Sequence, residues 1–118
     1  MVTQDWQELA LKELEMARTA RISGNEGRAR VCARRAAGHV IGEYLSRSEN
    51  TFASESALER LRFLYSSPLI TDQQRETIGH FLVHTTPDHE LPIDADLIED
   101  VHLLARQLMG ESLPWRFN

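Results

Sequence analysis

The sequence predicts an all-α protein, an up-and-down bundle of four or five helices. Apolar residues recur every three or four positions from end to end, and no segment has the strict alternation of a half-buried strand. With 118 residues, 42% of them hydrophobic, the chain suits a single core. We therefore expect residues 1–118 to form one helical domain, with a short aromatic tail over residues 111–118.

Two predicted helices occupy the first part of the chain. The first covers residues 4–21, where apolar side chains recur on one face. Two glycines in the segment 23–27 then turn the chain. The second helix covers residues 26–47, and its apolar stripe is centred near Ala36.

Three further helices are predicted over residues 54–66, 71–85 and 94–109. Ser54 is a suitable N-cap for the third helix, and Pro68 lies just beyond its end. Thr71 and Gln74 have the spacing of a capping box, which begins the fourth helix. Gly110 is a natural C-cap for the fifth.

Charge and composition narrow the classes of function. The net charge is −5, yet six arginines and one acid lie between Arg18 and Arg35. That patch could meet phosphates, but the acidic remainder argues against non-specific coating of nucleic acid. No apolar run approaches the roughly 20 residues of a membrane span, and the opening residues do not resemble a secretory leader. The single cysteine, Cys32, suits a reducing compartment, so we expect a cytoplasmic protein without membrane attachment.

Two glycines lie inside the second predicted helix. Gly38 and Gly42 point away from the apolar stripe, on the same side as Val31. Each glycine inside a helix costs about 1 kcal/mol relative to alanine, so another helix should approach closely there. That helix is either a neighbour in the same chain or a second copy. The second alternative makes Val31, Gly38 and Gly42 a dimer interface.

Three basic residues lie beside these glycines. Arg28, Arg35 and His39 fall on one side of the second helix, and Arg35 and His39 are neighbours four positions apart. They could bind a phosphate of RNA or of a nucleotide. The alternative is a solvated face whose charge Glu43 balances.

The run GNEGRARVCARRAAG, residues 24–38, joins an amphipathic helix to a second helix rich in small residues. It resembles the helical pairs of HEPN-domain proteins, mainly over residues 5–47. The resemblance implies a small helical bundle, commonly a homodimer, that partners a nucleotidyltransferase or another toxin–antitoxin component. It also implies a second class, the metal-independent RNases, marked by an arginine, four to six residues and a histidine.

The arginine–histidine pattern occurs twice, at Arg34 and His39 and at Arg75 and His80. The resemblance favours the second pair, because it lies near the start of a late helix. His80 would act as an acid or base toward the 2′-hydroxyl of RNA, and Arg75 would stabilise phosphoryl charge. Chance alone produces such pairs in a chain with twelve arginines and five histidines, so both residues could also be ordinary helix residues.

A metal site is the third alternative. His80 and His84 lie one helical turn apart and His89 follows, a set that zinc could use. No HExxH motif accompanies them, and we expect neither a metal nor a cofactor. The sequence therefore predicts a non-catalytic binding or interaction module with a protein partner, and leaves the RNase and the metal-binding protein as alternatives.

Overall fold

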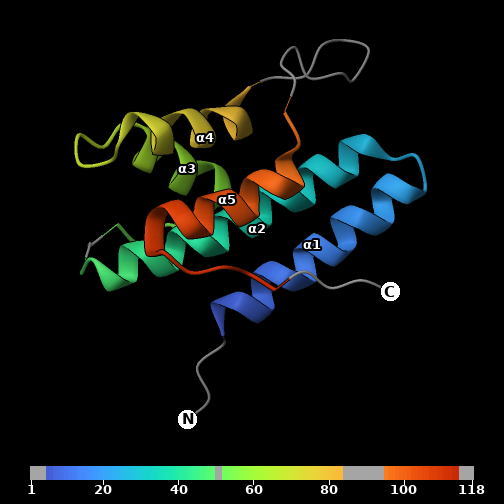
Figure 1. The fold of residues 1–118 in the computed structure, drawn as a ribbon, viewed down its shortest axis with the longest axis horizontal. Coiled ribbons are helices and arrows are strands. Elements are labelled where there is room, and N and C mark those ends of the chain that lie inside the picture. Colours follow the sequence, from blue (N-terminus) through green and yellow to red (C-terminus); the bar gives the residue numbers. More distant parts are fainter. Residues whose placement is uncertain (1–4, 50–51, 84–94, 115–118) are drawn as a thin grey trace.

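The computed structural model describes residues 5–49, 52–83 and 95–114, and within these ranges it contains helices and no strand (Figure 1). The helices are α1 (Trp6–Ile22), α2 (Glu26–Arg47), α3 (Ala57–Tyr65), α4 (Asp72–Leu82) and α5 (Leu97–Met109). The predicted all-α class is thereby confirmed. None of these described helices is long and apolar enough to cross a membrane.

Capping side chains set several of the helix ends where the sequence predicts them. Thr71 and Gln74 form the capping box of α4: the Thr71 hydroxyl accepts from the Gln74 amide at 3.1 Å, and the Gln74 side chain accepts from the Thr71 amide at 2.8 Å. Gly110 ends α5 in the left-handed region, at φ 67°. Asp5 caps α1 by accepting from the backbone amide of Gln7.

Three helix ends lie three residues from the prediction, and one of them is the start of α5, at Leu97 rather than residue 94. α3 begins at Ala57, because Ser56 rather than Ser54 is its N-cap and accepts from the Glu59 amide at 3.3 Å. The Ser54 hydroxyl accepts from the Ser56 amide and donates to the Glu59 carboxylate. α4 ends earlier than predicted, at Leu82, where the backbone of Val83 becomes extended.

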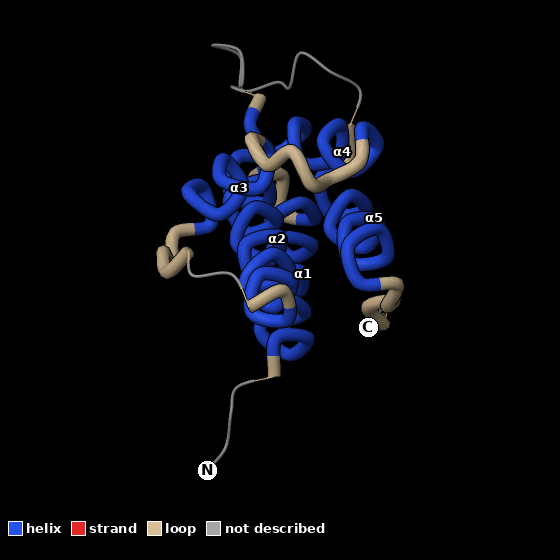
Figure 2. Tube along the Cα trace, turned by 90° about the vertical axis from the view of Figure 1, so that its left-hand side faces the viewer, coloured by secondary structure: helices blue, strands red, loops and turns tan. Residues whose placement is uncertain are grey.

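α2 is the central element of the fold. It forms an antiparallel hairpin with α1 and also packs against α3 and α5, while α4 packs on α3 and α5 (Figures 1 and 2). Alanines make up much of the buried surface of α1 and α2, and small side chains let helices pack closely; those of these two helices that are at most 1% exposed are Ala10, Ala17, Ala29, Ala33, Ala36 and Ala37. The largest buried side chains come from α2 to α5 and include Phe81, Ile41, Ile78, Leu61, Leu64, Leu97 and Leu104.

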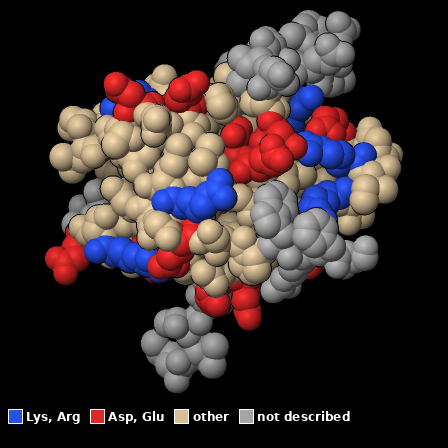
Figure 3. Space-filling view, in the orientation of Figure 1, with Lys and Arg blue, Asp and Glu red and all other residues tan. Residues whose placement is uncertain are grey.

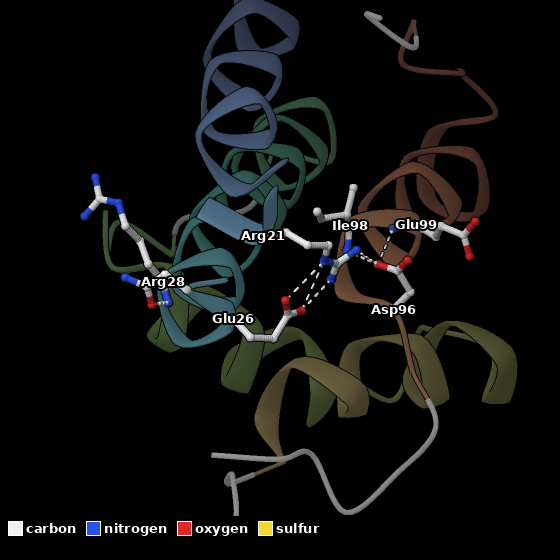
Figure 4. Close-up of polar contacts among 7 residues, drawn as sticks. Arg21, Glu26, Arg28, Asp96, Ile98 and Glu99 are labelled. Atoms are coloured by element: carbon white, nitrogen blue, oxygen red, sulfur yellow. Dashed lines mark hydrogen bonds and ion pairs between the residues drawn. The ribbon is translucent and has the colours of Figure 1, made fainter. Parts of the chain in front are cut away.

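Arg21 joins three helix ends at one end of the bundle (Figure 4). Its guanidinium lies between two carboxylates, 2.9 Å from Glu26 at the start of α2 and 3.1 Å from Asp96 just before α5. Asp96 also accepts from the amides of Ile98 and Glu99, so it caps α5 while it pairs with Arg21. The end of α1 is thus fastened to the beginnings of α2 and α5.

The glycines of α2 lie beneath α3 of the same chain. A Cβ added at Gly38 would lie 2.6 Å from the Cβ of Ala57, and one added at Gly42 would lie 2.5 Å from Nη1 of Arg60. Arg60 Nη1 also donates to the carbonyl of Gly38 at 3.0 Å. The close approach that explains both glycines is therefore made within one chain. An interface between two copies at Val31, Gly38 and Gly42 stays a prediction.

Part of the predicted aromatic tail packs onto the bundle. Leu113 is 2% exposed, and His102 of α5 makes a hydrogen bond with its backbone. Trp115 and Phe117 lie outside the described residues.

Candidate functional site

Arg75 and His80 of α4 contact different helices. Five positions turn a helix by roughly 140° beyond one full turn, so the two side chains point in different directions. The Arg75 guanidinium donates to the carbonyls of Tyr65 and, at 3.0 Å, Ser67, and it lies over the Tyr65 ring. Tyr65 is the last residue of α3, so its carbonyl has no partner within the helix, and Ser67 follows the C-cap Ser66. In this structure Arg75 caps α3.

His80 pairs with a carboxylate from α5. Its Nδ1 lies 3.0 Å from Oδ2 of Asp100, a residue that is 9% exposed. Burial raises the pKa of Asp100, although His80 and the hydrogen bond between them act in the opposite direction. A carboxylate in this position orients an imidazole, as in many acid–base sites. The sequence reasoning missed Asp100, because an acid near the start of a helix is already explained by the helix dipole.

Arg35 and His39 line one polar pocket of about 300 Å³ between α1, α2 and α3. Two carboxylates, Glu13 and Glu55, line the same pocket. Burial lowers the pKa of His39, Glu13 raises it, and Arg60 lowers it further. Both carboxylates oppose the binding of a phosphate, so the predicted phosphate site receives no support from its surroundings.

Arg28 does not join Arg35 and His39. It lines a separate pocket at the junction of α1 and α2, beside Lys12 and Asn25. The structure therefore brings together two of the three predicted phosphate-binding residues and leaves the third elsewhere.

Arg35 also lines a second hollow, together with Arg34 and Arg62. This hollow is a groove of about 410 Å³ between α2, α3 and the end of α4. We call it the arginine groove, and its lining residues in the described part of the chain are Val31, Arg34, Arg35, Ala57, Leu58, Arg62, Phe81, Leu82 and Val83. This lining contains three arginines and no acidic residue, and the rest of it is apolar.

The arginines of the groove differ in their contacts. Arg34 Nε donates to the carbonyl of Phe81 at 2.9 Å, which fastens α2 to the end of α4. Burial, and to a smaller extent the nearby Arg30, lowers the pKa of Arg34. Arg35 and Arg62 make neither an ion pair nor a side-chain hydrogen bond with any described residue. With respect to the described part of the chain, their guanidinium groups are therefore free to bind an anion.

Sequence reasoning missed the groove. It grouped Arg35 with Arg28 and His39 on one side of the second helix. No pattern links Arg35 to Arg34 or to Arg62, which lies on a different helix. The only available signal was the cluster of arginines between Arg18 and Arg35.

Basic and acidic side chains are interspersed over the face shown in Figure 3, which has no broad basic surface. Among the described residues, no three His, Cys, Asp or Glu side chains are grouped so that they could hold a metal ion. The predicted ligands His84 and His89 lie outside the described ranges.

No protein-family model matches this chain, and no curated protein or solved structure matches it. The HEPN resemblance therefore rests on residues 5–47 alone, and the geometry of the groove carries the functional argument.

Proposed function

We propose that this chain is a non-catalytic, HEPN-like binding module whose ligand site is the arginine groove. The observation that carries the proposal is the pair of free guanidinium groups, Arg35 and Arg62, in an apolar groove without a carboxylate among its described lining residues. Like charges in one groove repel each other, and a bound anion removes that repulsion. The HEPN resemblance adds a homodimeric state and a partner such as a nucleotidyltransferase or another toxin–antitoxin component.

The contacts of Arg75 support a binding role over catalysis. An RNase of the predicted type needs a cation and an acid or base at the same phosphodiester. Arg75 instead donates to the end of α3, while His80 faces α5. A single chain therefore offers no common position for the two groups in this arrangement.

One observation favours the RNase as a second candidate. Asp100 engages Nδ1 of His80, and Nε2 makes no hydrogen bond with the described part of the chain. Because the His80 side chain is 29% exposed, Nε2 could exchange a proton with a substrate.

A cleavage assay separates the two functions. Purified protein is incubated with a labelled single-stranded RNA in EDTA, beside His80→Ala, Arg75→Ala and the control His39→Ala. The module predicts no turnover by any of the four proteins. Turnover that His80→Ala abolishes and His39→Ala retains would replace the module with the RNase.

A stability assay tests the groove itself. Inorganic pyrophosphate, at constant ionic strength, is expected to raise the melting temperature of the wild type, because a ligand of the folded state stabilises it. Arg35→Ala with Arg62→Ala should lose this shift, and Arg28→Ala, which removes a positive charge from the same helix outside the groove, should retain it. No shift, or an equal loss with Arg28→Ala, would refute the groove as the anion site.

A further inference from the structure

Two exposed aliphatic side chains lie together in the arginine groove, whereas Ile22 and Leu69 are exposed elsewhere on the described surface. Val31 of α2 is 41% exposed and Leu58 of α3 is 40% exposed, and both line the groove. Apolar surface in a concave site is stabilised when another apolar group covers it. A ligand that carries charge alone would leave these two side chains in water.

Beside that apolar surface, the arginines of the groove favour a ligand with negative charge. Arg35 extends from α2 and Arg62 from α3, so the two free guanidinium groups come from different helices that line the groove. A guanidinium donates two parallel hydrogen bonds to a carboxylate, a geometry that gives both affinity and orientation. The ligand therefore needs acidic groups next to an aliphatic part.

The groove lacks the feature that single-stranded nucleic acids require. Such ligands stack their bases on exposed aromatic side chains. Phe81 is the one aromatic residue among the described lining residues, and its side chain is 0% exposed. Phe52 and Phe63 line another hollow, which shares Arg62 with the groove, and their rings stack on each other with centroids 4.2 Å apart. The net charge of −5 also opposes a long polyanion.

We infer that the arginine groove binds an acidic, aliphatic segment of a partner protein, with carboxylates on Arg35 and Arg62 and an aliphatic side chain between Val31 and Leu58. The inference rests on the proposed function, since it names the ligand of the same groove. A volume of about 410 Å³ is near the lower end of the range for ligand pockets, so it accommodates a few side chains of a short segment.

The first test is a selection of random peptides displayed on phage. The wild type is the target, and Arg35→Ala/Arg62→Ala is the target for counter-selection. The expected peptides contain Asp or Glu next to Leu, Ile or Val. Recovery of peptides without such acidic enrichment, or of none that discriminate between the two targets, would overturn the inference.

The second test measures one selected peptide, synthesised with a fluorescein label, by anisotropy. Arg62→Ala should weaken binding by about tenfold or more, because a charge-assisted hydrogen bond is lost. Leu58→Ser should weaken it without changing its dependence on salt, and Arg28→Ala should leave the affinity unchanged. Circular dichroism checks that each variant is folded.

A labelled single-stranded RNA serves as the competing class of ligand. If RNA binds, depends on Arg35 and Arg62, and displaces the peptide, the groove is a nucleic-acid site and the inference fails. Failure of the inference can be distinguished from failure of the proposed function. If no peptide binds but pyrophosphate still raises the melting temperature through Arg35 and Arg62, only the inference fails. If both assays fail, the inference and the proposed function are both refuted.

Discussion

Replacement of Gly38 by alanine tests how closely α3 packs on α2. Glycine to alanine inside a helix normally stabilises it by about 1 kcal/mol. At Gly38, however, the new Cβ would lie 2.6 Å from the Cβ and 2.9 Å from the Cα of Ala57. The Cα belongs to the backbone, so relief requires a movement of α3 itself.

The balance of two opposing effects sets the size of the expected change. Overpacking a well-packed contact costs about 1–3 kcal/mol. A movement of α3 also strains the hydrogen bond from Arg60 to the Gly38 carbonyl. Because the backbone of α3 must move, we place the overpacking cost in the upper part of this range, at about 2–3 kcal/mol. Subtracting the gain of about 1 kcal/mol in helix propensity leaves an expected loss of about 1–2 kcal/mol of unfolding free energy for Gly38→Ala.

Two other glycines of α2 provide matched controls. A Cβ at Gly27 would have one neighbour within 4 Å, the side chain of Asn25 at 3.8 Å, so Gly27→Ala should gain up to about 1 kcal/mol. A Cβ at Gly42 would meet the end of the Arg60 side chain, which can move, so Gly42→Ala should be nearly neutral.

Urea unfolding followed by far-ultraviolet circular dichroism measures these differences. The expected order of stability is Gly27→Ala, then wild type and Gly42→Ala, then Gly38→Ala. A Gly38→Ala protein as stable as the wild type would refute the packing argument.

Light scattering on Gly42→Leu tests the dimer: a fall from dimer to monomer mass with helix content retained would place the glycines at an interface between copies.

Three further changes have expected outcomes. Burial lowers the pKa of His102 below its ordinary value of 6.5, so as pH falls the unfolded chain binds the proton first and stability is lost. His102→Gln should therefore make the decline of the urea midpoint below about pH 6.5 shallower, and an unchanged slope would contradict the lowered pKa. Arg21→Ala removes both ion pairs of Figure 4. Because these pairs are partly exposed, we expect the unfolding free energy to fall by about 1 kcal/mol, and by less at high salt. A loss that does not depend on salt would argue against ion pairing. Thr71→Ala should cost about 1 kcal/mol in the same unfolding assay, and no loss would mean that the capping box contributes nothing.

Local chemistry explains which helix ends could be predicted. Thr71 with Gln74, and Gly110, satisfy helix ends through residues that are neighbours in the chain. The start of α3 could not be predicted in the same way, since Ser54 and Ser56 are both suitable caps. Ser56 is the N-cap in the structure, and a side chain of α3 contacts the segment before it: Arg60 Nε donates to the carbonyl of Ser54 at 2.8 Å.

Only some residue types of the candidate site could be predicted from the sequence. The sequence indicates an excess of arginine in α2, but the arginine groove also needs Arg62 from α3 and the end of α4. Arg75 and His80 show the opposite case. Their spacing in the sequence suggests one site. In the structure, however, Arg75 donates to the end of α3 and His80 pairs with Asp100 of α5.

The sequence by itself determined the all-α class, the approximate extent of the helices and the apolar stripe of α2, because these depend on residues within a few turns of each other. The tertiary structure alone decided that α3 covers Gly38 and Gly42, that Asp100 meets His80, and that Arg34, Arg35 and Arg62 share one groove. These contacts join residues that are distant in the chain, and a helical periodicity defines the face of a helix without defining the helix that packs against it.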